Sequence, residues 1–263
     1  MIAYWAIFSA RFRVLLQYRS AAMAGAVTQL FFGLVRVMML GVFYDSVTSA
    51  QPMSYPDVVT YTWLGQAMLL LAMFTADTEV SEMILSGSVL YELVRPIDLY
   101  RLWLCRAIAS RTAPTLLRLI PVLFVAGLFF GLKAPDSILS AGLFTVSLVV
   151  AILLSSAMVT ILTISLLWTI SGEGINRLAP SIVMFFSGLI VPLPLLPGWV
   201  QSIIAVLPFR GLADLPFRIY MGHIAPPQAV LAILHQMIWT GALVLFGSWL
   251  LTRMVRKLVI QGG

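Results

Sequence analysis

The chain has few charged residues: they make up 10% of its 263 residues, whereas apolar residues make up 61%. Soluble domains contain about 25% charged and about 45–50% apolar residues. Ten acidic and sixteen basic side chains cannot cover the surface of a water-soluble protein of this size, so a soluble fold is excluded. Intrinsic disorder is excluded as well, because disordered segments combine low hydrophobicity with high charge. The composition therefore predicts an integral membrane protein.

Residue types that carry catalytic and metal chemistry are also scarce. Cys105 is the only cysteine, which excludes an internal disulfide and a cysteine-based metal site. The two histidines form no H-E-x-x-H pair, and the sequence has no G-x-S-x-G segment. Neither lysine, Lys133 or Lys257, stands in a G-x-x-x-x-G-K-[ST] loop, so the sequence has no phosphate-binding P-loop. We therefore expect no enzymatic activity, and the scattered bases do not indicate nucleic-acid binding.

Long apolar runs separated by polar turns predict an all-α membrane protein with six spans. A span needs about 20 mostly apolar residues to cross a bilayer core of about 30 Å. The predicted spans are residues 20–44, 58–76, 113–132, 137–170, 178–191 and 228–251. Residues 137–170 carry no charge, which leaves open whether they form one tilted helix or two broken ones. We expect residues 1–263 to build a single transmembrane domain.

The aromatic and basic residues near the start of the chain predict an interfacial helix over residues 1–19. Trp5, Phe8 and Phe12 recur at helical spacing, and Arg13 falls on another face. A frayed beginning of the first span is the alternative.

The distribution of bases predicts the orientation in the membrane, because Lys and Arg accumulate in cytoplasmic loops. With the N-terminus inside, twelve of the sixteen bases lie in cytoplasmic segments: Arg11, Arg13, Arg19, Arg95, Arg101, Arg106, Arg111, Arg118, Arg177, Arg253, Arg256 and Lys257. We therefore expect both termini in the cytoplasm. Arg111 and Arg118, near the inner end of the third span, are expected to reach lipid phosphates.

Residues 77–111 form the largest predicted cytoplasmic segment and carry five of the ten acidic residues. Glu79 and Glu82 belong to a short amphipathic stretch, which Gly87 interrupts. Pro96 disfavours a helical conformation at Arg95, so the stretch must stop or turn there. A short helix with an apolar and an acidic side fits a docking surface for another protein; capping of the bundle is the alternative.

Residues 192–227, between the last two predicted spans, contain seven prolines separated by short apolar runs. Runs such as residues 199–207 are too short to cross the membrane, so they predict interfacial or re-entrant helices in the outer leaflet. A proline-rich surface loop is the alternative.

Arg36 interrupts the first predicted span. An arginine inside the membrane costs at least about 2.5 kcal/mol and usually faces the bundle interior or an aqueous cavity. We expect Arg36 to line a substrate pathway or to pair with an acidic residue, and snorkelling along its own helix is the alternative. The candidate acidic partners are Asp45, Asp57 and Asp214. Met39 and Met68 are candidates for an adaptable pathway wall, although packing alone also explains them.

This arrangement resembles the permease subunit of ABC-2 type ABC exporters over nearly the whole chain. The segments SEMILSGSVLYELVRPIDLY and PLPLLPGWVQSIIAVLPFRG carry the resemblance. Together they are similar to a bacterial branch that often has two different permease subunits, with members linked to efflux of viologens and other drug-like organic cations. The resemblance implies a coupling helix at about residues 79–96 that sits on a separate ATPase. The implied coupling residues are Glu79, Glu82, Gly87, Leu90, Leu93, Arg95 and Pro96.

The resemblance also implies the partners and the task of this chain. ATP and Mg would bind to a partner ATPase dimer, and this chain would bind no cofactor or metal itself. A second permease subunit, identical or homologous, would complete the pathway within the lipids of a bacterial cytoplasmic membrane. The expected function is export of a hydrophobic or amphipathic substrate, either a drug-like organic cation or a lipid-like molecule. The alternative is a secondary transporter or channel, against which stands the absence of an acidic residue clearly inside a span.

Overall fold

The computed structural model describes residues 2–47, 51–167 and 173–256, and these ranges contain helices and no strands. The elements are α1 (Ile2–Gln17), α2 (Arg19–Ser46), α3 (Tyr55–Ala67), η1 (Leu69–Leu71), α4 (Thr78–Leu85), α5 (Leu90–Leu93), α6 (Leu99–Phe129), α7 (Ile138–Ser165), α8 (Glu173–Phe186), η2 (Leu193–Leu195), α9 (Gly198–Val206), η3 (Pro208–Leu212), α10 (Asp214–Tyr220) and α11 (Pro226–Val255). Elements labelled η are 3₁₀ turns. The predicted all-α class is confirmed.

Four helices within the described ranges are long and apolar enough to cross a membrane, namely α2, α6, α7 and α11. They overlap the predicted spans 20–44, 113–132, 137–170 and 228–251. α7 is one continuous helix. α6 begins well before the predicted span, because the side chain of Asp98 accepts a hydrogen bond of 2.7 Å from the backbone N–H of Arg101 and caps the helix. The chain is a multi-pass membrane protein.

The other two predicted spans, residues 58–76 and 178–191, contain shorter helices. α3 has 13 residues and α8 has 14, which corresponds to about 20 Å each, less than the bilayer core of about 30 Å. After α3 the chain continues through η1 into residues 73–77, which form no helix or strand. The count of six spans therefore stays a prediction.

Side chains from α6 and α7 satisfy the backbone carbonyls that are freed where α3 ends. Nη1 of Arg111 donates hydrogen bonds of 2.7 Å to the carbonyls of both Leu70 and Met73. Oγ of Ser155 donates one of 2.8 Å to the carbonyl of Leu71. Non-helical backbone at membrane depth persists only where such partners exist. The expectation that Arg111 reaches lipid phosphates is wrong, because its guanidinium group is buried beneath this break.

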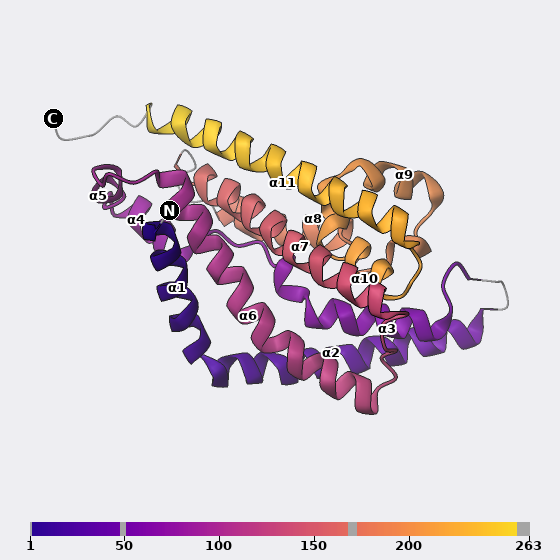
Figure 1. The fold of residues 1–263 in the computed structure, drawn as a ribbon. Helices are drawn as coiled ribbons and strands as arrows, with labels where there is room; N and C mark the ends of the chain where they lie inside the picture. The colour runs from indigo at the N-terminus through magenta and orange to yellow at the C-terminus, as the bar shows by residue number, and fades with distance from the viewer. Residues whose placement is uncertain (1, 48–50, 168–172, 257–263) are drawn as a thin grey trace.

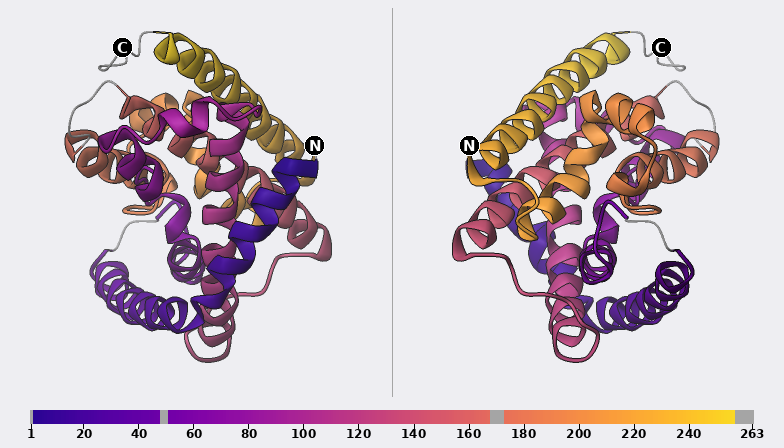
Figure 2. Two further views of the ribbon diagram at one scale, coloured as in Figure 1. Left: turned by 90° about the vertical axis from the view of Figure 1, so that its left-hand side faces the viewer. Right: turned by 90° about the vertical axis from the view of Figure 1, so that its right-hand side faces the viewer.

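The helices form a bundle with α2 on one side, α11 on the opposite side and α7 between them (Figures 1 and 2). α7 is the most buried of the four long helices. Its inward positions include Ser156, Thr160 and Thr163, whose hydroxyls donate to carbonyls of their own helix. Small residues of this kind let helix backbones approach closely. α1 lies across the end of the bundle that also holds α4 and α5, as Figure 1 shows.

Short helices occupy residues 192–227, and α9 and α10 lie at the end of the bundle opposite α4 and α5 (Figure 1). Gln236 of α11 is fully buried and holds this region in place. Its amide nitrogen donates a hydrogen bond of 2.6 Å to the carbonyl of Gly211 in η3, and its amide oxygen accepts one of 2.9 Å from Ser147 of α7. A buried amide with these partners fixes η3 between α7 and α11.

Candidate functional site

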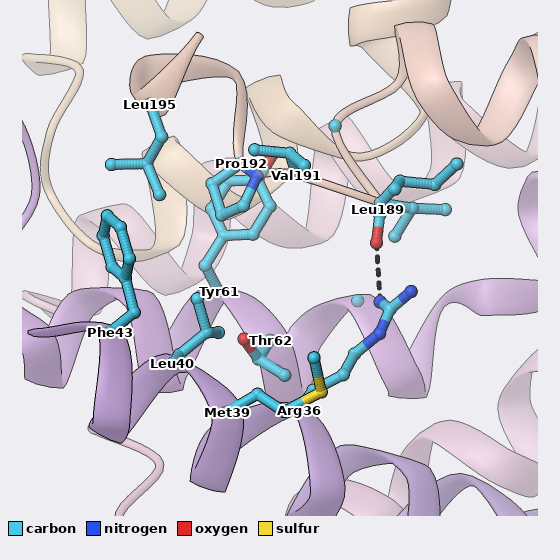
Figure 3. Close-up of a pocket in the computed structure, with 13 residues that line it drawn as sticks. Arg36, Met39, Leu40, Phe43, Tyr61, Thr62, Leu189, Val191, Pro192 and Leu195 are labelled. Carbon is cyan, nitrogen blue, oxygen red and sulfur yellow. Dashed lines mark hydrogen bonds between the residues drawn. The ribbon is translucent and has the colours of Figure 1, made fainter.

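A cavity of about 370 Å³ lies between α2, α3 and the segment that follows α8 (Figure 3). Figure 3 shows Arg36, Met39 and Phe43 entering from α2 and Tyr61 from α3. The remaining lining residues are Leu40, Thr62, Gly65, Gly188, Leu189, Ile190, Val191, Pro192 and Leu195. The walls are mainly apolar, and Arg36 is the only charged residue that lines this cavity.

A second cavity, of about 340 Å³, lies on the other side of Arg36, toward α1. Its lining residues are Gly25, Thr28, Gln29, Phe32, Arg36, Gln66, Leu69, Met73, Arg118 and Met184. Arg36 is common to both linings. α2 and α3 therefore border two successive cavities, which we call the outer and inner cavities, and Arg36 separates them.

Arg36 crosses from α2 to the segment after α8. Its Nη1 donates a hydrogen bond of 2.6 Å to the carbonyl oxygen of Leu189, drawn as a dashed line in Figure 3. Leu189 follows Gly188, whose φ of 89° ends the helical hydrogen-bond pattern of α8. No ion pair joins Arg36 to Asp45, Asp57 or Asp214, all of which belong to the described residues, so the predicted acidic partners are wrong. Asp57 instead pairs with Lys133 at 2.8 Å, and Asp214 accepts a hydrogen bond from Tyr61.

The two predicted methionines differ in position. Met39 lines the outer cavity and is 68% exposed. Met68, at the end of α3, is 1% exposed, belongs to the core and lines neither cavity. Arg118, expected at lipid phosphates, is half-buried beside Gly25 and lines the inner cavity. The sequence did not predict that Tyr61 and residues 188–192 form a wall of the outer cavity.

Two glycines allow α3 to lie close to α2 on one side and to the segment after α8 on the other. A Cβ atom added to Gly33 of α2 would overlap the ring of Trp63 in α3. A Cβ atom on Gly188 would overlap the hydroxyl of Tyr61 and lie 2.9 Å from Cγ of Leu193. Both positions therefore need a residue without a side chain.

At the α1 end of the bundle, a network of ion pairs holds the predicted coupling segment. Arg106 of α6 pairs with Glu92 of α5 at 3.2 Å and also with Glu79 of α4. Trp103 Nε1 donates a hydrogen bond of 2.8 Å to the same Glu92 carboxylate, which is buried. The network thus connects α4 and α5 to the first turns of α6.

Arg11 of α1 joins this network. It pairs with Glu79 at 2.8 Å and with Asp77 at 3.4 Å, and its Nε donates a hydrogen bond of 3.2 Å to Ser110. Burial alone would raise the pKa of the Glu79 carboxyl, but the hydrogen bond from Arg11 and the charges of Arg11 and Arg106 outweigh it, so the pKa lies below the usual range. Glu79 is held ionised by arginines of its own chain.

Three large apolar side chains are exposed on the surface around α4 and α5, among exposed polar and charged residues. Leu85, Tyr91 and Val94 are 71%, 73% and 80% exposed; we call these three residues the α4–α5 face. Of the predicted coupling residues, Glu82, Gly87, Arg95 and Pro96 are exposed, and Leu90 and Leu93 are half-buried. Glu79 is exposed as well, although its carboxylate pairs with Arg11, whereas Glu92 is buried and pairs with Arg106.

Comparison with known proteins identifies the family to which the chain belongs. The model of the ABC-2 family transporter proteins matches residues 30–262, a range that contains both cavities apart from Gly25, Thr28 and Gln29, together with α4 and α5. No curated protein matches the chain. Proteins of this family are membrane components of transporters. The match spans most of the chain and agrees with its helical bundle and its membrane-crossing helices. The chain therefore belongs to the ABC-2 transporter family.

Proposed function

We propose that this chain is the permease subunit of an ATP-driven exporter, and that the cleft formed by the outer and inner cavities is part of its translocation pathway. Membership of the ABC-2 family supports a transport role and association with an ABC ATPase. The observation that carries the proposal is the position of Arg36, which lines both cavities and bridges their walls through Leu189.

The lining of the cleft favours one of the two expected substrate classes. Its apolar walls fit a hydrophobic or amphipathic molecule. In the described part of the chain Arg36 has a backbone carbonyl as its partner and no carboxylate, which leaves its positive charge without a counter-ion there. This charge repels an organic cation and attracts an acceptor or anionic head group. A lipid-like amphiphile is therefore the substrate class that we propose, ahead of the drug-like cation.

The α4–α5 face is the proposed docking surface for the ATPase, which would bind ATP and Mg. Its three exposed apolar side chains can bind a partner, and an ion pair connects α5 to α6 beneath them. A movement of the bound partner would therefore be passed on to α6. A second permease subunit would complete the pathway along α2, whose exposed side includes Phe31, Met38 and Val42. We place the complex in a bacterial cytoplasmic membrane, with α1 and the end of α11 on the cytoplasmic side.

Reconstituted transport tests the pathway. The chain would be purified with its ATPase and partner permease, placed in liposomes and supplied with ATP and either a fluorescent phospholipid or a lipophilic cationic dye. We expect ATP-dependent movement of the phospholipid, reduced at least tenfold by Arg36→Gln at unchanged yield. Arg101→Gln changes an exposed arginine of α6 and serves as the matched control. Transport that needs no ATPase would instead establish a secondary transporter or channel.

Co-purification tests the docking surface separately. Val94→Asp places a charge in the α4–α5 face and should abolish recovery of the ATPase with the tagged permease. Ile138→Asp makes the same kind of change at a residue that is 95% exposed at the other end of the bundle, and it should leave recovery unchanged. Full recovery of the ATPase with Val94→Asp would refute this docking surface while leaving the pathway intact.

A further inference from the structure

Two arginines share one carboxylate at the end of the bundle opposite α4 and α5. Arg210 lies in η3 and Arg218 in α10, which Figure 1 places at that end. One guanidinium nitrogen of each lies 3.9 Å from the same oxygen, Oδ2 of Asp214. Two guanidinium groups that share one carboxylate carry one positive charge more than that carboxylate neutralises.

The donors of this arginine pair are largely unused. A distance of 3.9 Å exceeds the range of a hydrogen bond, and neither guanidinium group donates one to any other residue in the described part of the chain. The Nε atoms of both Arg210 and Arg218 are buried without an acceptor. Asp214 is 1% exposed, and its other oxygen accepts a hydrogen bond of 3.3 Å from Tyr61. Buried charged donors without acceptors are costly, which indicates an acceptor from outside the chain.

Space for such an acceptor exists on both sides of the arginine pair. A cavity of about 280 Å³ is lined by both arginines together with Gln201 and Ser202. A second cavity, of about 360 Å³, is lined by both arginines together with Gln228. The first cavity also contains Asp214, and the second also contains His223 and His235. In each cavity the two guanidinium groups stand beside uncharged polar side chains, and they exceed the single carboxylate in charge, which suits an oxyanion.

Exposed apolar faces flank the arginine pair. On α9, Trp199, Ile203 and Val206 are 71%, 55% and 69% exposed. On α11, Leu231 lines the larger cavity and is 64% exposed, and Leu234 one turn further is 48% exposed. A ligand with a charged oxyanion and hydrocarbon chains can satisfy the guanidinium groups and these faces together.

We propose that Arg210 and Arg218 bind a phosphate group, and that a phospholipid supplies it, with its acyl chains against α9 and α11. Each planar guanidinium donates to phosphate oxygens, and the phosphate provides the negative charge that Asp214 alone does not. Free inorganic phosphate shares this chemistry and is the other source that the experiment distinguishes. Arg210 and Arg218 line neither the outer nor the inner cavity, and Tyr61 connects this site to the outer cavity through its hydrogen bond to Asp214.

Ligand-dependent thermal unfolding of the purified full-length chain in detergent tests the site. The probes are dihexanoyl phosphatidylglycerol, dihexanoyl glycerol without phosphate, and inorganic phosphate against chloride at equal ionic strength. We expect stabilisation by the phospholipid at lower concentration than by inorganic phosphate, and none by the phosphate-free lipid. A response to inorganic phosphate as strong as that to the phospholipid would retain the phosphate site and assign it to the free anion.

Two variants report on the arginines. Arg218→Gln leaves Arg210 beside Asp214, and the triple variant R210Q/D214N/R218Q removes all three charges, so neither leaves the carboxylate alone. Both should weaken the apparent affinity for the phospholipid at least tenfold. Arg13→Gln, on the exposed side of α1, controls for general attraction to phosphate and should bind as the unchanged protein does. Equal responses in all four proteins, or no response to either phosphate-bearing probe, would overturn the proposal.

Discussion

Replacing Arg106 with methionine should destabilise the chain strongly, because Arg106 is the ion-pair partner of the buried Glu92. The Glu92 side chain is 7% exposed, and Trp103 would be its only remaining hydrogen-bond partner in the described part of the chain. Removing one member of a buried ion pair costs about 3–5 kcal/mol, since a charge stays behind without compensation. In a chain of this size each kcal/mol lowers the midpoint of thermal unfolding by about 2–4 °C, so Arg106→Met should lower it by about 6–20 °C.

The assay is thermal unfolding of the purified protein in detergent, followed by tryptophan fluorescence. Arg106→Met, Glu92→Gln and the double variant form a double-mutant cycle. Glutamine retains an oxygen that can accept the hydrogen bond from Trp103, so the double variant should be more stable than Arg106→Met alone. Arg101→Met, an exposed position on the same helix, should change the free energy of unfolding by less than about 0.5 kcal/mol.

Two results would refute this reasoning. One is an equal midpoint for Arg106→Met and Arg101→Met, which would mean that the pair adds no stability. The other is a double variant as unstable as Arg106→Met, which would mean that the loss comes from packing of the arginine stem and not from the abandoned carboxylate.

Three further predictions concern packing and pH. Gly188→Ala should lower the free energy of unfolding by about 1–3 kcal/mol, because alanine disfavours the positive φ and its methyl group would meet the Tyr61 hydroxyl. Thermal unfolding in detergent measures this loss, and Gly142→Ala, at a glycine with open space around it, is the control. Gly33→Leu should push α2 away from Trp63 and reduce ATP-dependent transport in liposomes, and normal transport would contradict the close approach. Glu79 has a lowered pKa, so its contribution to stability is complete above the usual carboxyl pKa and is lost as the pH falls through the lower folded-state value. Unfolding midpoints measured between about pH 6 and about pH 3 should therefore fall less steeply for Glu79→Gln.

The membrane class and the general order of helices could be predicted from the sequence, because they depend on composition and on the length of apolar runs. The position of α7 follows from an uncharged stretch, although the sequence left open whether this stretch forms one helix or two. The end of α3 at Ala67 could not be predicted in this way. It depends on Arg111 and Ser155, which are distant in sequence and accommodate the broken backbone.

In the candidate sites, too, the sequence predicts which residues matter but not which partners they contact. The sequence indicates that Arg36 needs a partner, and the partner is a backbone carbonyl, which every residue has and no sequence pattern can single out. The acidic residues near residue 80 can be identified in the sequence, but the side chains with which they pair cannot. Arg11 and Arg106, which the sequence analysis counted only as markers of orientation, form ion pairs with Glu79.

The ion pairs at the α1 end make α6 a lever. Arg106 fastens the base of this 31-residue helix to α4 and α5. The lever is about 46 Å long, so a tilt of about 5° at its base moves its far end by about 4 Å. Just beyond that end, the Phe130 carbonyl accepts a hydrogen bond of 3.0 Å from Trp63, and the two rings stack with centroids 5.4 Å apart. A small rotation at the α4–α5 end of the bundle would thus displace α3 by about the width of a methylene chain.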